Sequence, residues 1–304
     1  MSHAVAKCVV CNGENQKPLF AARDRHYGIP GVFTIVRCEG CSLVFLNPMY
    51  SDMELAGLYP SDYYAYQDNF KVAPWKRLLK NALCGRVGTK DPYFSKAGRM
   101  LDLGCGSGWF LASKRDLGWE TFGVEINESA AQLGQTAAGL NIYAGTLAEA
   151  QFPASYFDYV RSNHSFEHMT QPGETLDEIR RVLKPDGKVL IGVPNFESLN
   201  AKLFGQYWWY LGAPVHPFTY SAKTIAQLLE RHRFHVEHVN YNSDWGGILG
   251  SVQIWLNRSN GRKSTEGWLI NNRPLRVVCY WAAKVLDALR LGDAIEITAT
   301  KADA

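Results

Sequence analysis

The segment RMLDLGCGSGWFLASKR, residues 99–115, is the feature that most constrains how this chain folds. A short apolar run ends at Leu103, glycines follow at Gly104, Gly106 and Gly108, and a helix-like stretch comes next. A strand, a glycine-rich turn and a helix in this order form a cradle for a nucleotide or a nucleoside in α/β proteins. The segment therefore predicts an α/β fold with a ligand at the end of this strand.

From residue 99 onward, strand-like and helix-like segments alternate, which favours parallel strands joined by helical crossovers. The expected strands are 99–104, 120–127, 156–163, 188–194, 234–241 and 294–301, and the expected helices are 108–118, 128–139, 173–187 and 221–232. Ser221 is expected to cap the last of these helices, and Pro185 with Gly187 to end the one before it. Two long connections, 195–220 and 242–292, are expected to be insertions beside the ligand crevice.

Four of the seven cysteines form two Cys-x2-Cys pairs near the N-terminus, Cys8 with Cys11 and Cys38 with Cys41. Two such pairs can place four thiolates tetrahedrally around Zn²⁺, in a closed and structural site. Disulfides and redox-active thiols are the alternatives. The module closes one side of the active site, or else it is a stabilising cap or a protein-contact surface. The expected organisation is a small zinc-binding module in 1–70, a basic connector in 71–98 and the main domain in 99–304.

Charge and hydropathy exclude several classes of protein. The formal net charge of the 304 residues is only +3, which counts against a nucleic acid partner, although zinc ribbons also bind RNA. The start, MSHAVAKCVV, lacks the basic region and the apolar core of a signal peptide. No apolar run is long enough to span a bilayer, and a cytoplasmic location is therefore expected.

Residues 275–291 carry an apolar stripe at 278, 281, 282, 285 and 289, flanked by basic residues. A stripe at this spacing marks one face of an amphipathic helix. We expect it to pack against its own domain or against a second copy in a homodimer. Peripheral contact with a membrane surface is the alternative.

The spacing of the glycines narrows the choice of ligand. The dinucleotide fingerprint would place a third glycine at Trp109, and the Lys-Ser/Thr of a phosphate loop is absent. S-adenosylmethionine carries no phosphate; Asp102 can anchor its ammonium group, and Glu125 can accept both of its ribose hydroxyls. A nicotinamide oxidoreductase stays an alternative, because its glycine loop and acid have a similar spacing.

Taken together, LDLGCGSGWFL, GVEIN, FDYVRSNHSFEHM, EIRRVLKPDGKVLIGVPN and HPFTYSAKTIAQLLE resemble the class I S-adenosylmethionine-dependent methyltransferases. The resemblance covers about residues 99–240 and is to the broad bacterial group often linked to glycan or lipid biosynthesis. It extends to the paired cysteines and the segment LNPMYSDMELAGLYPSDYY that follows them. It implies a Rossmann-like seven-stranded sheet whose last two strands, 234–241 and 294–301, form an antiparallel pair.

The resemblance also implies which residues hold the cofactor. Leu147 replaces an acid that many methyltransferases use on the adenine amino group, so a backbone group or Glu149 would have to serve. Arg233 stands where the family usually has glycine at a helix end. The implied cofactor-binding residues are Asp102, Gly104 and Gly106 in the loop, Glu125 at the ribose, Thr146 and Leu147 beside the adenine, and Asn163 beside the methionine moiety.

A methyl acceptor with a hydroxyl group needs a base for its proton. His164, Glu167 and His168 follow a strand whose C-terminal end faces the crevice, and His216 lies in the aromatic insertion. His164 and His216 are the leading base candidates, Glu167 or His168 orients the turn, and each histidine is otherwise structural. The aromatic residues that either stack on an acceptor sugar or belong to the core are Tyr207, Trp208, Trp209 and Phe218.

The sequence thus predicts methyl transfer to a hydroxyl of a saccharide or another small molecule, such as a sugar or a lipid-linked glycan. Carbon methylation of a nucleotide-linked sugar is one alternative. A non-catalytic binding protein that keeps the fold is the other.

Overall fold

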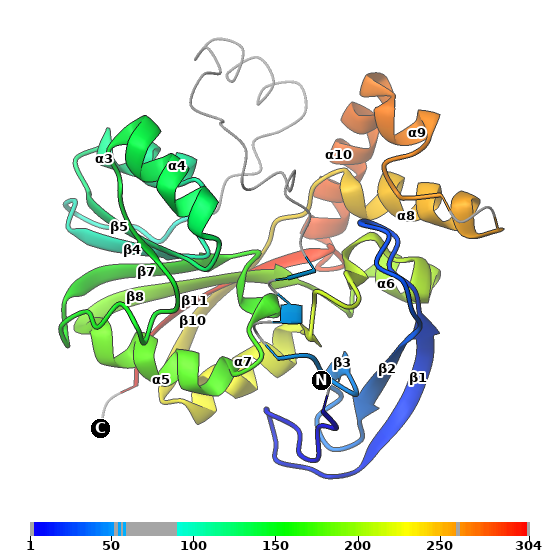
Figure 1. The fold of residues 1–304 in the computed structure, drawn as a ribbon, viewed down its shortest axis with the longest axis horizontal. Helices are drawn as coiled ribbons and strands as arrows, with labels where there is room; N and C mark the ends of the chain where they lie inside the picture. Colours follow the sequence, from blue (N-terminus) through cyan, green and yellow to red (C-terminus); the bar gives the residue numbers. More distant parts are fainter. Residues whose placement is uncertain (1–2, 52–53, 56, 59–89, 260–261, 303–304) are drawn as a thin grey trace.

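The structure is a computed structural model that describes residues 3–51, 54–55, 57–58, 90–259 and 262–302 (Figure 1). Most of the expected connector, 71–98, lies outside these ranges. The described part contains a seven-stranded sheet, a four-stranded sheet and the helices around them.

The strands of the larger sheet are in the order β10-β11-β8-β7-β4-β5-β6. The five strands β8, β7, β4, β5 and β6 are parallel to one another. Strand β11 runs antiparallel to both of its neighbours, β8 and β10. This confirms the expected seven-stranded α/β fold with an antiparallel last pair. The bounds are β4 (Arg99–Leu103), β5 (Glu120–Glu125), β6 (Asn141–Ala144), β7 (Phe157–Asn163), β8 (Leu183–Pro194), β10 (Phe234–Tyr241) and β11 (Ala294–Lys301).

Helices cover both faces of this sheet. Helices α3 (Trp109–Arg115) and α4 (Glu128–Ala138) lie on one face, and α5 (Pro172–Val182) and α7 (Ala222–Arg231) lie on the other (Figure 1). The expected cap at Ser221 is present, because its side chain accepts from the amide of Thr224 in a capping box.

Two local expectations differ from the structure. Helix α5 ends at Val182, five residues early, because the carbonyls of Arg181 and Val182 accept from the amides of Ser155 and Tyr156. These bonds direct the chain into β8 before Pro185, and a residue preceding proline disfavours helix in any case. The short strand β6, which has only four residues, was not expected from the sequence.

The smaller sheet joins distant parts of the chain. Its order is β1 (Gln16–Ala22), β2 (Phe33–Cys38), β3 (Val44–Leu46) and β9 (Phe218–Thr219), all antiparallel. The N-terminal segment therefore takes its last strand from the 195–220 insertion. One continuous cluster of buried side chains includes both the cysteine-bearing segment and the core of the larger sheet.

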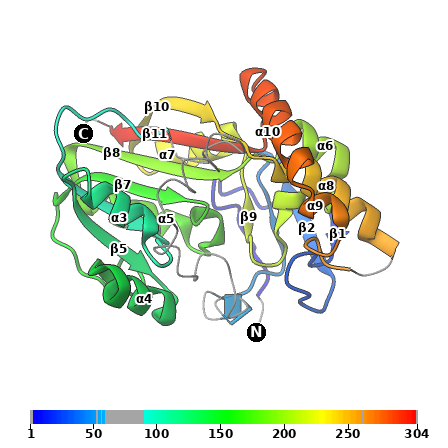
Figure 2. The same cartoon turned by 90° about the horizontal axis from the view of Figure 1, so that it is seen from above.

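The insertions contain helices, which group beside β1 and β2 at one end of the larger sheet (Figure 2). The buried carboxylate of Asp293 accepts hydrogen bonds from Ser198, Asn200 and Trp208 of the first insertion. The two insertions are joined by the amide of Trp209, which donates to Oγ of Ser251 at 2.9 Å. The elements are α6 (Leu199–Phe204), η3 (Gly205–Tyr207) and η4 (Trp209–Leu211) in the first insertion, and α8 (Gly246–Leu256), η5 (Asn257–Ser259), α9 (Trp268–Asn271) and α10 (Arg273–Ala288) in the second.

The apolar stripe of α10 does not pack against its own domain in the described structure. Val278, Trp281, Val285 and Leu289 are 63%, 59%, 60% and 62% exposed. Of the two expected partners of the stripe, its own domain does not cover it among the described residues, because α10 contacts α8 through its opposite face, where Ala283 is buried. Packing against a second copy stays a prediction. Among the described helices, none has the length and apolarity needed to cross a membrane.

Candidate active site and four-cysteine centre

The glycine loop lies where the C-terminal ends of β4, β5 and β7 meet, at the topological switch point of the sheet. Gly104 and Gly106 have φ values of 69° and 56°, which favour glycine. A Cβ atom on Gly104 would overlap the Oγ atom of Ser165, so the loops that follow β4 and β7 touch here. The cofactor loop and the segment bearing His164 are thus in direct contact.

Glu125 ends β5 and spans the glycine loop. Its Oε2 atom accepts from the amide of Gly106 at 2.8 Å, and its Oε1 atom accepts from the amide of Asn127 at 2.9 Å. Burial raises the pKa of this carboxyl group, against the lowering effect of the two amide donors. The carboxylate therefore lies at the mouth of the loop, where the resemblance places the ribose hydroxyls.

Asp102 is buried and forms an ion pair with Arg161, with 2.6 Å between Oδ1 and Nη1. The two residues are opposite each other on β4 and β7, and the guanidinium lies 3.8 Å from the centroid of the Phe110 ring. Burial raises the pKa of Asp102, although the charge of Arg161 opposes this shift. The predicted contact of Asp102 with the cofactor ammonium group stays a prediction.

Thr146 and Leu147 follow β6 in a tight turn. The amide and the hydroxyl of Thr146 both donate to Oε2 of Glu149 at 2.8 Å, and these bonds lower the pKa of Glu149. The side chain of Leu147 is buried in the main hydrophobic cluster. Glu149 therefore holds the turn, and its contact with adenine, like that of Leu147, stays a prediction.

Asn163 and His164 stand at the end of β7. The Oδ1 atom of Asn163 is buried without a hydrogen-bond partner in the described part of the chain, and it occupies the space that a Cβ at Gly192 would need. His164 has a φ of 53°, which turns the chain sharply after the strand. The ring of Tyr210 stacks on His164 with a centroid separation of 6.3 Å.

Glu167 pairs with His164, with 3.6 Å between Oε1 and Nδ1. Burial alone would lower the pKa of His164, but the hydrogen bond and charge of Glu167 outweigh it and raise the pKa. Burial would raise the pKa of Glu167, yet His164, His168 and His216 together lower it to about 2. A charged carboxylate thus orients the imidazole of His164.

His216 approaches the same carboxylate from the first insertion. Its ring lies 4.6 Å from that of His168, and its Nδ1 atom contacts the carbonyl of Tyr210 at 3.0 Å. Burial and the neighbouring His168 lower the pKa of His216 to about 3, so it is a weak base at neutral pH. The role of either histidine as the base stays a prediction.

The aromatic residues of the first insertion divide between two environments. Trp208 and Phe218 are both 1% exposed, and the indole Nε1 of Trp208 donates to Asp293 at 2.7 Å. The alternative that these two stack on an acceptor is therefore wrong, because they are core residues. Tyr207 and Trp209 are only partly buried.

The four N-terminal cysteines come together as the spacing predicts. The sulfur atoms of all four lie within 4.8 Å of one another, with 3.5 Å between Cys8 and Cys41 and between Cys11 and Cys38. A disulfide would need about 2.05 Å. Zinc with ligands at about 2.3 Å holds tetrahedral sulfurs at about 3.8 Å, so the donor set fits this metal. Burial raises the pKa of Cys8 to about 11, which a bound cation would reverse.

Residues 73–239 match a family model described as a methyltransferase domain. The chain belongs to this family. It therefore carries a methyltransferase domain. The elements of the site from the glycine loop to His164 lie within the matched residues.

Relatives of this methyltransferase share only part of its length. The ubiquinone biosynthesis O-methyltransferase of Rhodopseudomonas palustris is 33% identical over 101 residues, which are 32% of this chain and 40% of that one. The ubiquinone/menaquinone biosynthesis C-methyltransferase UbiE of Bordetella parapertussis is 27% identical over 164 residues, 51% of this chain and 61% of that one. The matched part of the chain thus spans less than two thirds of the length of either relative.

A solved structure has a similar fold at low sequence identity. An S-adenosylmethionine-dependent methyltransferase from Archaeoglobus fulgidus has a TM-score of 0.48 and 22% identity, covering 75% of this chain and 100% of that one.

Sequence reasoning missed one prominent residue of the methyltransferase site. Arg161 is the sole cation within the apolar strand FDYVRSN, and that isolation was the only available signal for its pairing with Asp102. A buried arginine requires a partner, so a search for an acid on a neighbouring strand could have found it.

Proposed function

We propose that the methyltransferase acts on oxygen, and that its acceptor is a hydroxyl of a saccharide or of another small molecule. The observation that carries this proposal is His164, which stands at the end of β7, is oriented by Glu167 and stacks on Tyr210. Its neighbour Ser165 touches the glycine loop. An imidazole placed so close to the cofactor loop suits removal of a hydroxyl proton.

S-adenosylmethionine supplies an activated methyl group on its sulfonium. Glu125 would hold the ribose, and the loop from Gly104 to Gly106 would lie against the ligand, where small residues permit a close approach. The acceptor oxygen would take this methyl group as the carbon–sulfur bond breaks, which would leave S-adenosylhomocysteine. The hydroxyl proton passes to Nε2 of His164, and Glu167 stabilises the imidazolium that forms.

A zinc ion bound by the four cysteines is part of the same proposal. Such a closed site is structural. Its support is the shared hydrophobic cluster that links Cys8 and Cys41 to the larger sheet, and the bond from Nη1 of Arg231 to the carbonyl of Val10 at 3.1 Å. The zinc would thereby fix the sheet that receives β9, two residues after His216.

The exposed apolar stripe of α10 is a surface that could place the protein beside a lipid-linked acceptor. We propose that it contacts an anionic lipid surface, which suits a lipid-linked glycan as acceptor. Trp281 and its apolar neighbours provide the buried face, and the exposed Arg273 and Arg290 stand at the two ends of the helix to meet anionic headgroups. The biosynthetic group that the sequence resembles is consistent with this acceptor.

The proposal is tested with radiolabelled S-adenosylmethionine and a panel of saccharide and glycolipid acceptors. We expect an O-methyl product by NMR, and His164→Ala should lower kcat by about 10²–10⁴-fold with an unchanged Kd for the cofactor. The exposed His238→Ala is the control. A product with a new carbon–carbon bond would favour methylation of a sugar carbon, and cofactor binding without turnover would favour a binding protein.

A further inference from the structure

Glu167, His168 and His216 form a second cluster of metal-ligating side chains. One ligand atom from each lies within 4.8 Å of the others, and among the described residues only the four cysteines form another such group. Glu167 and His168 belong to η2 (Phe166–His168), whereas His216 lies between η4 and β9. The cluster therefore assembles only in the folded chain.

The two imidazoles are held in one tautomer. Nδ1 of His168 contacts the carbonyl of Val215 at 2.8 Å, and Nδ1 of His216 contacts the carbonyl of Tyr210 at 3.0 Å. Because a carbonyl only accepts, each Nδ1 carries the hydrogen and each Nε2 carries the lone pair. A backbone carbonyl on one ring nitrogen is the usual support for a histidine that ligates metal through the other.

Glu167 supplies an independent sign of a missing partner. The residue is 1% exposed, and its Oε2 atom has no hydrogen-bond partner within the described part of the chain. Oε1, by contrast, faces His164. A buried carboxylate oxygen without a partner is costly, and a cation on Oε2 would remove that cost.

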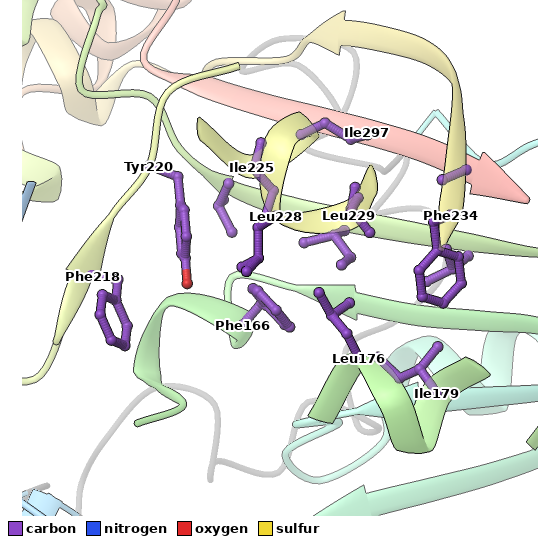
Figure 3. Close-up of a cluster of buried hydrophobic side chains, with 14 of the residues drawn as sticks. Phe166, Leu176, Ile179, Phe218, Tyr220, Ile225, Leu228, Leu229, Phe234 and Ile297 are labelled. Atoms are coloured by element: carbon purple, nitrogen blue, oxygen red, sulfur yellow. The ribbon is translucent and has the colours of Figure 1, made fainter. Parts of the chain in front are cut away.

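The elements that carry the three ligands are rigidly packed. Phe166 faces Tyr220 and Leu228 in the buried cluster, with 5.9 Å between the rings of Phe166 and Tyr220 (Figure 3). Gly212 has a φ of 59°, and a Cβ there would overlap the ring of His216. The ligand atoms are thus held close together before any ion binds, as a preorganised metal site requires.

We propose that Glu167, His168 and His216 bind a divalent transition-metal cation. Two imidazoles and one carboxylate suit zinc, cobalt or iron, and three protein ligands leave coordination positions open. The site lies beside His164, which shares Glu167 with it. If the proposed function holds, the open positions of the ion would admit an acceptor oxygen beside His164. Acceptors with two adjacent hydroxyls, which can chelate the ion, are then favoured.

The test is a Co²⁺ titration of the full chain whose four cysteines have first been loaded with zinc. No methyl donor or acceptor is present, so the result does not depend on the proposed function. We expect one Co²⁺ per chain, with visible bands that lack thiolate charge transfer. Proton NMR should show two strongly shifted, solvent-exchangeable signals from the two Nδ1–H groups, a result that needs no variant.

Three variants sharpen this test. Glu167→Gln and His216→Asn should each weaken Co²⁺ binding by about tenfold or more, and His216→Asn should also remove one of the two shifted signals. The exposed His238→Asn should change neither. The proposal is overturned if the zinc-loaded protein binds no Co²⁺, if no shifted imidazole signals appear, or if both ligand variants bind as the wild type does. Failure of methyl transfer with Co²⁺ bound would count against the proposed function alone.

Discussion

Arg161 and Asp102 face each other across β7 and β4, and their buried side chains form an ion pair of 2.6 Å beside the cofactor loop. Each charge compensates the other in a region that excludes water. Removing one of them leaves the other buried without a partner, which costs more than the pair itself contributes.

Arg161→Met should therefore lower the free energy of unfolding by about 3–5 kcal/mol, measured by urea denaturation. The matched control is Arg99→Met at the start of β4, because Arg99 makes an exposed ion pair with Glu120 on β5 and its replacement should cost at most about 1 kcal/mol. Adding Asp102→Asn to Arg161→Met should recover much of the loss. Equal costs for the buried and the exposed arginine would contradict this account.

Glu125 should make cofactor binding depend on pH. Burial raises the pKa of its carboxyl group, and the ionised form is the one that accepts hydrogen bonds from the ribose. Affinity is thus full above the raised pKa and declines as the pH falls through it. In the wild type, isothermal titration should show that the Kd for S-adenosylmethionine rises as the pH is lowered from about 7 to about 4.5. Glu125→Gln should bind weakly and nearly equally across that range; a parallel pH dependence in this variant would assign the effect to another group.

Two glycines with similar φ values allow the steric cost of an added Cβ to be measured apart from the cost of backbone strain. Gly104 and Gly139 have φ values of 69° and 62°, but a Cβ on Gly104 would overlap Ser165, whereas nothing lies within 4 Å of one on Gly139. Gly139→Ala should cost about 1 kcal/mol from backbone strain alone. Gly104→Ala should cost more than that and abolish cofactor binding, as thermal unfolding and titration would show. Retention of full affinity in Gly104→Ala would contradict the assigned cofactor loop.

Contiguous patterns predicted where the glycine loop, Glu125 and His164 lie in the fold, because each stands at the end of a strand that its own residues specify. Other features depend on partners remote in sequence. Arg161 meets Asp102 across 59 positions, and the two-residue strand β9 pairs with β3 although it is too short for any local periodicity. The exposed stripe of α10 could not be assigned from sequence either, since an amphipathic pattern marks an apolar face without saying what covers it.

The four-cysteine centre should contain one zinc per chain. Its removal by a chelator should lower the free energy of unfolding by about 3 kcal/mol or more, because structural zinc sites contribute directly to folding. Cys41→Ser should lose the metal, whereas Cys279→Ser, which alters a cysteine outside the cluster, should retain it. Metal content by atomic absorption and unfolding by circular dichroism measure both effects. A metal-free protein of unchanged stability would show that the cysteines are not a structural centre.

Helix α10 should bind vesicles that contain anionic lipid. Trp281 and Val285 are 59% and 60% exposed on its apolar stripe, so Trp281→Glu combined with Val285→Glu should abolish cosedimentation by burying charge at the lipid surface. Arg290→Ala should weaken the partition constant by about fivefold, since a cation near such a surface contributes about 1 kcal/mol. Neutral vesicles and high salt should reduce binding of the wild type in the same sense. A different result would show that a second copy of the chain covers this stripe. In that case the wild type would be a dimer by light scattering and would not bind vesicles, and the double variant would be a monomer.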